Sequence, residues 1–172
     1  MLAILKLLQS LVATLHSEGS PRQVALGFAL GASLGLTPLV NVHNGIVVLL
    51  LCVLNVSFGA GMLAWLVCTP VGFLLDPLFD RVGQFLLLGT PSLTPVWTSW
   101  YNMAGMPWTN FNNSVVLGSV VCWLVLFAPT AFAARWGLRR YRATYAATFE
   151  SSRYMRAVKA SRLYNVWTWF NP

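Results

Sequence analysis

The stretch Gly27–Pro38, GFALGASLGLTP, combines a hydrophobic composition with a glycine at every fourth position. Four residues make about one helical turn, so these glycines lie on one face of a helix. The stripe consists of Gly27, Gly31 and Gly35. A second stripe of small residues on the same helix consists of Ala25, Ala29, Ser33 and Thr37. Two small faces let two neighbouring helix backbones approach closely, which is how helices associate in lipid. We therefore predict that this helix is sandwiched inside the protein, with the three glycines as packing residues.

The start of this helix is predicted by the four residues before Val24. Ser20 is a preferred N-cap residue, and Pro21 suits the first helical position because its missing N–H would be unpaired there anyway. Gln23 stands three residues after Ser20, which completes the pattern of a capping box. The sequence therefore predicts a helix that begins at Pro21 and is broken at Pro38.

The composition of the chain indicates a helical membrane protein. The 172 residues are 57% hydrophobic and only 9% charged, whereas a soluble domain carries about a quarter charged residues. Two apolar stretches, Phe58–Leu75 and Val115–Ala134, hold 18 and 20 residues, enough to cross roughly 30 Å of hydrocarbon. The shorter apolar stretches are Val24–Val40 and Ile46–Leu54. The predicted fold is all-α: a polytopic helical membrane protein with short broken or re-entrant helices.

Polar residues interrupt the apolar sequence directly after Pro38. Asn41, His43 and Asn44 precede a short apolar piece of nine residues. Unpaired polar groups at membrane depth are costly, so the predicted turn Asn41–Gly45 must be wet or wrapped in protein. One interpretation is a broken or re-entrant segment that lines a cavity and contacts a substrate. The other is an ordinary polar turn at the membrane surface between two crossings.

Asp76 and Pro77 directly follow the apolar stretch Phe58–Leu75 and predict its end. Asp76 suits an N-cap, Pro77 the first position of a new helix, and Asp80 its first turn. The rival interpretation, a carboxylate pair for acid–base chemistry, is weaker because capping already explains both residues. Asp76 remains a candidate for a polar path together with the break at Pro38.

The segment Gly83–Ser114 holds no charged residue and is rich in aromatic side chains. Aromatic rings with polar partners are typical of the membrane interface, and the absence of Lys and Arg favours the outer, periplasmic side. We expect these aromatic residues to contact a partner protein or lipid headgroups: Trp97, Trp100, Tyr101 and Trp108.

The two ends of the chain are expected on the cytoplasmic side. Eight of the eleven basic residues lie within Arg135–Arg162, and such clusters next to a span favour the cytoplasm and anionic lipid over nucleic acid. The expected lipid contacts are Arg135, Arg139, Arg140 and Arg142. Residues 1–19 read as an amphipathic interfacial helix, with an uncleaved anchor as the alternative. The predicted organisation is therefore 1–19 on the membrane, 20–134 within it and 135–172 as a basic cytoplasmic tail that includes an amphipathic helix.

The sequence shows no motif for catalysis, metal binding or a cofactor. No phosphate-binding loop, nucleophile–base pair or metal-ligand spacing is present. Cys52, Cys68 and Cys122 lie within apolar segments and read as free thiols. We therefore predict a protein that is not an enzyme and binds no cofactor.

Several blocks of the sequence resemble a family of small uncharacterised bacterial inner-membrane proteins, a branch of a larger domain-of-unknown-function family. The blocks include SPRQVALGFALGASLGLTPL, NVHN, DPLFDRVG, FNNSVVLGS and RWGLRRYR. The resemblance covers nearly the whole chain and implies a bacterium with an outer membrane. It also implies a large partner that spans the envelope, and it brings no assigned catalytic residues.

These observations lead to two expectations for function. The first is a non-enzymatic, multi-pass inner-membrane subunit that anchors a large periplasmic partner and passes phospholipid between the membrane and that partner. The lipid part rests on the resemblance alone. The second is a small transporter or channel, a homo-oligomer, with a polar path along Asn41, His43, Asn44 and Asp76.

Overall fold

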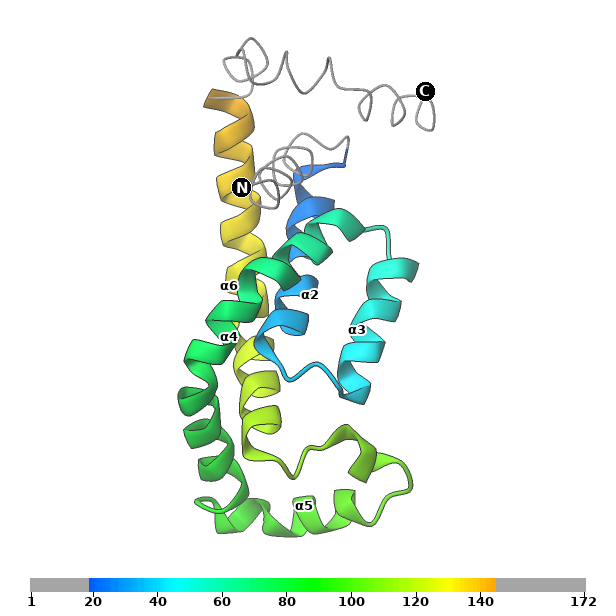
Figure 1. Cartoon of the computed structure of the whole chain (residues 1–172), viewed down its shortest axis with the longest axis vertical. Helices are drawn as coiled ribbons and strands as arrows, with labels where there is room; N and C mark the ends of the chain where they lie inside the picture. The colour runs from blue at the N-terminus through cyan, green and yellow to red at the C-terminus, as the bar shows by residue number, and fades with distance from the viewer. Residues whose placement is uncertain (1–18, 145–172) are drawn as a thin grey trace. The chain divides into compact units, whose positions relative to one another are not determined.

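A computed structural model of the chain describes residues 19–144, and these residues form an all-α protein (Figure 1). The expected interfacial helix and the part of the basic tail beyond Thr144 lie outside the described residues. The chain divides into two compact units, one being Gly19–Arg135, and the described part of the other covers residues 136–144. The elements in chain order are α2 (Pro21–Leu36), α3 (Val42–Val53), α4 (Phe58–Leu87), the 3₁₀ turn η1 (Pro91–Leu93), α5 (Thr94–Tyr101), η2 (Met106–Thr109) and α6 (Ser114–Thr144).

Helix α2 begins where its capping residues predict. The Ser20 side chain accepts a hydrogen bond from the Gln23 backbone N–H at 3.3 Å, and the Ser20 N–H donates to the Gln23 side chain at 2.8 Å. The predicted capping box is therefore confirmed. The helix ends at Leu36, and Thr37 turns the chain into an extended conformation ahead of Pro38, as expected for a residue that precedes proline.

Helices α2 and α4 pack backbone to backbone along the glycine stripe. A Cβ atom on Gly31 would overlap the Gly61 carbonyl and lie 2.5 Å from the Gly61 Cα. Gly27 approaches the Ser57 carbonyl in the same way, and Gly35 lies against Trp65 and Thr69. The contacts advance together along both helices, so α2 and α4 run in the same direction. We call these contacts the glycine seam.

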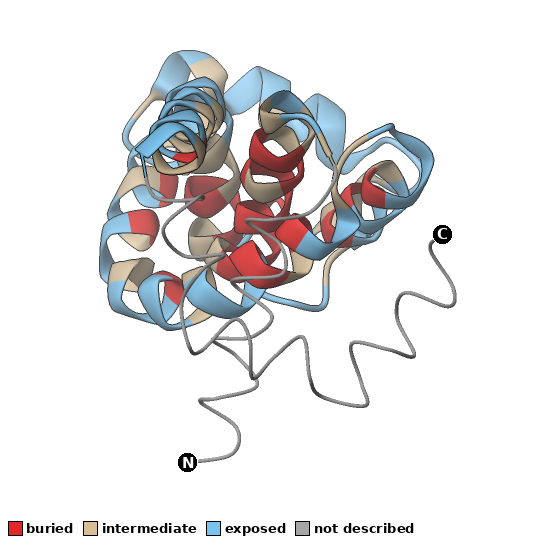
Figure 2. Cartoon of the chain, turned by 90° about the horizontal axis from the view of Figure 1, so that it is seen from above, coloured by how far each residue is buried: buried red, intermediate tan, exposed pale blue. Residues whose placement is uncertain are grey.

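Helices α2 and α3 form a hairpin that starts and ends at the same level. At its base, the Gln23 side chain donates to the Asn55 side chain at 2.7 Å, and the Ser57 N–H donates to the Gln23 carbonyl at 3.1 Å. Between the helices lies a core of Leu30, Leu34, Val47 and Leu51, part of the buried centre in Figure 2. The helices hold 16 and 12 residues, about 24 and 18 Å, shorter than a typical crossing.

Helix α4 continues through Asp76 and Pro77, so the predicted helix start at Asp76 is wrong. The expectation followed local preference, since an interior proline costs about 3 kcal/mol. Packing overrides that preference: Gly72 lies against Gly35 before the proline, and Phe79 lies against Gly118 after it. The helix bends along its length instead of ending (Figure 1), and interior prolines at 70 and 77 are an ordinary cause of bending.

Helix α6 returns along α4 in the opposite direction and reaches the second small face of α2. Gly118 packs on the Phe79 carbonyl and Gly83 on the Ser114 carbonyl, each too close for a Cβ atom. Further along, the Trp123 indole N–H donates to the Ala29 carbonyl at 2.9 Å. Inside the Gly19–Arg135 unit, helix α2 therefore has α4 along its glycine face, and α6 contacts it at Ala29 of the second stripe.

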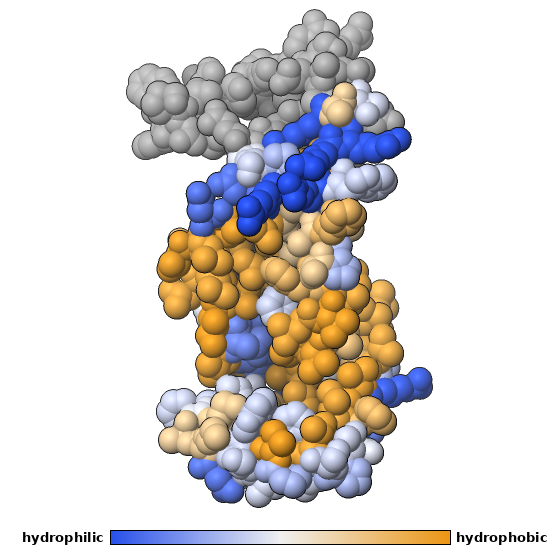
Figure 3. All heavy atoms as spheres, turned by 180° about the vertical axis from the view of Figure 1, so that it is seen from behind, coloured by the Kyte–Doolittle hydropathy of each residue, from blue (hydrophilic) through white to orange (hydrophobic). Residues whose placement is uncertain are grey.

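Two helices among the described residues, α4 and α6, are long and apolar enough to cross a membrane. Their most apolar windows are only 28% and 22% buried inside the protein, whereas a core helix of a soluble protein is buried on most of its surface. Figure 3 shows the resulting apolar surface over the middle of the Gly19–Arg135 unit. This exposure indicates membrane association.

Candidate functional site

The break after α2 is shorter than predicted and is closed by the Asn44 side chain. Helix α3 begins at Val42, so the expected turn Asn41–Gly45 is mostly the first turn of a helix. Thr37 Oγ1 donates to Asn44 Oδ1 at 2.8 Å, and Asn44 Nδ2 donates to the Pro38 carbonyl at 2.9 Å. Asn44 is only 5% exposed, and its hydrogen bonds hold the two helices of the hairpin together at the tip.

Asn41 connects the hairpin tip to the segment that precedes α6. Its side chain donates to the Pro38 carbonyl at 2.7 Å and accepts from Asn110 Nδ2 at 2.8 Å. Asn110 adopts a left-handed backbone conformation, with φ of 54°, which asparagine tolerates better than most residues. The two asparagines are 69 positions apart in the sequence. Their hydrogen bond places the hairpin tip next to the segment that precedes α6.

A cavity of about 660 Å³ lies between the hairpin tip and the start of α6. We call it the amide pocket because four asparagines take part in its wall. Its lining residues are Pro38, Leu39, Val40, Asn41, Asn110, Asn112, Asn113, Val115 and Val116, all of them uncharged. The cavity therefore offers amide donors and acceptors beside apolar side chains.

Hydrogen-bond capacity in the amide pocket is only partly used. Asn113 Oδ1 caps α6 by accepting from the Val116 N–H at 3.2 Å, and Asn41 uses both its oxygen and its nitrogen in the bonds to Asn110 and Pro38. Among the described residues, Asn112 is exposed and its side chain has no hydrogen-bond partner. The Asn112 amide therefore remains free to bind a ligand through both its oxygen and its nitrogen.

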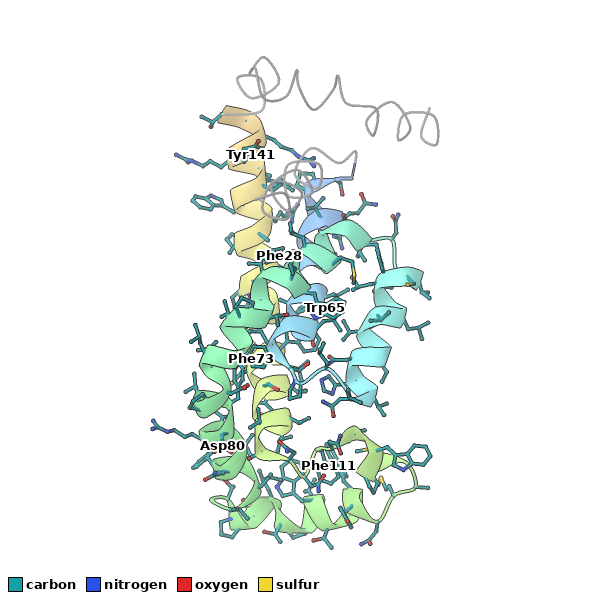
Figure 4. All side chains as sticks on the ribbon, viewed as in Figure 1. Phe28, Trp65, Phe73, Asp80, Phe111 and Tyr141 are labelled. Carbon is teal, nitrogen blue, oxygen red and sulfur yellow. The ribbon has the colours of Figure 1, made fainter. Side chains whose placement is uncertain are left out.

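An aromatic cluster centred on Phe111 lies next to the amide pocket. The Phe111 ring has centroid distances of 6.2 Å to Trp97, 6.1 Å to Trp100 and 6.5 Å to Tyr101. Phe111 is 7% exposed, and Figure 4 shows it in the segment before α6, near α5. The Trp97 indole N–H also donates to the Leu86 carbonyl at 2.9 Å. The cluster is the small core of this end of the unit.

A second cavity, of about 690 Å³, lies between this aromatic cluster and the end of α4. Its lining residues are Gln84, Leu87, Leu88, Thr94, Trp97, Thr98, Tyr101, Asn102, Phe111, Asn112 and Ser114, again without a charged side chain. Asn112 lines both cavities. The two cavities are therefore neighbours that share Asn112 in their walls.

Asp80, in the C-terminal half of α4, joins this helix to the start of α6. Its carboxylate accepts hydrogen bonds from the Ser114 hydroxyl and, at 2.8 Å, from the Gln84 side chain. Figure 4 shows Asp80 on the same half of α4 that leads to α5. This carboxylate therefore has hydroxyl and amide partners that fix the aromatic end in place.

The other residues expected at the break are not gathered into one cavity. His43 is half-buried, and its Nε2 atom is without a hydrogen bond among the described residues. Asp76 lies inside α4, and no hydrogen bond within residues 19–144 joins it to Asn41, His43 or Asn44. Of the predicted set, Pro38 and Asn41 line the amide pocket.

The remaining predicted residues divide between exposed and packed positions. Trp108 on η2 is 78% exposed and Tyr101 is 56% exposed, whereas Trp97 is packed in the aromatic cluster. In the basic part of α6, Arg139 and Arg140 are exposed, and the Arg140 guanidinium lies 5.8 Å from the Trp136 ring centre. Arg135 and Arg142 are half-buried.

Sequence reasoning missed Asn110, Asn112 and Asn113 as site residues. Their signal is visible in the run TNFNNS directly before an apolar helix, where amides beside a membrane-compatible segment are functional pointers. What the sequence could not show is that this run folds against Pro38–Asn41. Within the described residues, no group of three or more His, Cys, Asp and Glu side chains is placed to hold a metal ion.

Fold and site together define a small all-α, membrane-associated protein with uncharged cavities at one end. The chain belongs to the DUF2062 family, described as uncharacterised proteins conserved in bacteria, whose model matches residues 6–146. No curated protein and no solved structure matches the chain.

Proposed function

We propose that this protein is a multi-pass subunit of the bacterial inner membrane that anchors a large periplasmic partner and passes phospholipid to or from it. The observation that carries the proposal is the end built by α5, η2 and the hairpin tip. That end combines exposed aromatic side chains with two uncharged cavities. It is the place where a membrane protein would meet both a partner and lipid headgroups.

The distribution of charge supports the proposed orientation. Helix α6 leaves its apolar stretch at Arg135 and carries Arg139, Arg140 and Arg142, and arginines next to a span favour the cytoplasmic side. The segment Gly83–Ser114, which links the end of α4 to the start of α6, holds no charged residue. In our proposal this end therefore faces the periplasm, and both termini lie in the cytoplasm because α4 and α6 cross in opposite directions.

The partner would dock on η2 and α5. Trp108, Tyr101 and Met103 are 78%, 56% and 50% exposed, and such side chains dominate protein-binding hot spots. The Phe111 cluster beneath them keeps the surface in a fixed shape, which lowers the entropic cost of binding. The rigid support and the exposed rings together fit a docking surface.

A transporter or channel formed by a homo-oligomer is the less favoured function. It would need a continuous polar path, but Asn44 is enclosed by Thr37 and Pro38, and Asp76 shares no hydrogen bond with the break in the described part of the chain. Asn112 and Asn113, which keep free hydrogen-bonding atoms within residues 19–144, both line the amide pocket at one end of the unit. This arrangement supports handling of a headgroup at the membrane surface.

Affinity purification in mild detergent tests the proposal. The tagged protein should recover one large periplasmic protein together with phospholipid, identified by mass spectrometry, and Trp108→Ala should reduce recovery of that protein. Phe73→Ala is a matched control, since Phe73 is 72% exposed on α4 in the membrane-compatible region. A stable homo-oligomer that recovers no large partner would contradict the proposal and support the channel.

A further inference from the structure

We propose that the amide pocket binds the headgroup of a zwitterionic phospholipid in preference to an anionic one. This inference rests on the proposed function, because it names the substrate class of the lipid handling described above. Three features of the pocket carry it: its free amide groups, its lack of charge and its apolar rim. Each feature excludes a different alternative ligand.

The free amides supply both kinds of hydrogen bond. Asn112 has no partner among the described residues, so its Nδ2 can donate and its Oδ1 can accept. Asn113 uses its oxygen to cap α6, which leaves its Nδ2 as a further donor. A phosphate accepts from such donors, and an ammonium donates to such an acceptor. The pocket therefore matches a head that carries both groups.

The charge balance selects a head without net charge. All lining residues of the amide pocket are uncharged, so an anionic head would enter without a cationic side chain in the wall to compensate it. A net charge that is even partly removed from water without a partner of opposite sign is disfavoured. A zwitterionic head brings its own ammonium beside its phosphate, and the amides need only supply hydrogen bonds.

The apolar rim indicates a ligand with acyl chains. Val40 and Leu39 are 91% and 57% exposed, and Val115 and Val116 also line the pocket, at the start of the membrane-compatible helix α6. A free polar solute would leave the exposed rim in contact with water. An amphiphile places its head on the amides and its chains along the rim, as expected for a site at the membrane interface. The volume of about 660 Å³ lies in the usual range for ligand cavities, about 300–1,000 Å³.

Native mass spectrometry of the full chain tests this selectivity. The protein is released from nanodiscs that contain equal amounts of phosphatidylethanolamine and phosphatidylglycerol. We expect retained phosphatidylethanolamine to exceed phosphatidylglycerol. Asn112→Leu should weaken retention about tenfold, because hydrogen bonds to a charged group are lost. Asn112→Lys should shift retention toward phosphatidylglycerol, because the new ammonium supplies the missing positive charge. Asn112 is exposed and has no hydrogen-bond partner within residues 19–144, so both variants should fold.

The control variant is Ser92→Leu, at an exposed residue of η1 that lines neither cavity and has no side-chain hydrogen bond within residues 19–144. It should retain phosphatidylethanolamine as the unaltered protein does. Equal or greater retention of phosphatidylglycerol by the unaltered protein would overturn the inference, and so would unchanged retention in both Asn112 variants. Selective retention without any recovered partner would uphold this site while contradicting the proposed anchoring role. Recovery of a large partner without lipid selectivity would uphold the anchoring role and contradict this site.

Discussion

Gly31 of α2 lies so close to Gly61 of α4 that the α4 backbone leaves no room for a side chain at position 31. A Cβ atom on Gly31 would overlap the Gly61 carbonyl, and the Gly61 position is also in contact range of Leu51 from α3. The three helices of the N-terminal half therefore meet at one point. This contact explains why small residues recur at four-residue intervals in an otherwise bulky helix.

The first prediction concerns this contact. Gly31→Ala should destabilise the protein by roughly 1–3 kcal/mol, because the added methyl group forces α2 and α4 apart. The measurement is thermal unfolding in detergent. Gly45→Ala is the matched control: Gly45 is also helical, but a Cβ atom added there would meet no other atom within 4 Å. Alanine there should be neutral or stabilising by up to about 1 kcal/mol. Equal unfolding temperatures for the two variants would contradict the role of the seam.

The second prediction concerns the hairpin tip. Asn44→Leu should destabilise the protein by about 1–3 kcal/mol, because it removes the buried amide that joins Thr37 and Pro38. His43→Gln should destabilise the protein less than Asn44→Leu, because His43 Nε2 has no hydrogen bond to lose within residues 19–144. Detergent unfolding measures both. If His43→Gln proves the more damaging change, the structural role assigned to Asn44 is wrong.

The third prediction separates the two tryptophan roles at the α5 end. Trp97→Phe should lower stability, because it removes the indole hydrogen bond to the Leu86 carbonyl and loosens the cluster around Phe111. The loss should be about 0.5–1.5 kcal/mol or more. Trp108→Phe should leave stability unchanged, since Trp108 is 78% exposed. Unfolding curves that shift equally for both variants would show that η2 is part of the core.

The fourth prediction concerns topology. A green fluorescent protein fused after Pro172 should fluoresce, because both ends of the chain are expected in the cytoplasm. Alkaline phosphatase inserted after Ala104, in the exposed loop between α5 and η2, should be active, because that loop is expected in the periplasm. A C-terminal fusion without fluorescence together with an inactive loop insertion would reverse the orientation.

Local signals predicted the N-terminal half of the fold well. The start of α2 depends on Ser20, Pro21 and Gln23 alone, and the glycine spacing marks one face of a single helix. The all-α class followed from hydropathy and length. Each of these features is encoded within one helix, so each can be read without knowledge of tertiary contacts.

The features that sequence reasoning missed depend on tertiary contacts. Pro77 reads locally as a helix start, yet contacts of Gly72 and Phe79 with other helices carry α4 through it. Asn44 reads as part of a turn, yet its bonds to Thr37 and Pro38 fold it into α3. To predict the amide pocket, one would have to know that Asn41 contacts Asn110, and no local sequence pattern contains this information.

The most direct test of the proposed function places a photocrosslinker at Trp108 in living cells. Benzoylphenylalanine at this position, the most exposed ring of the docking surface among those named above, should crosslink to one large periplasmic protein. The same group at Phe73 should crosslink to lipid and not to that protein. A crosslink from position 108 only to lipid, or only to a second copy of the chain, would contradict the claim that this end of the molecule anchors a periplasmic partner.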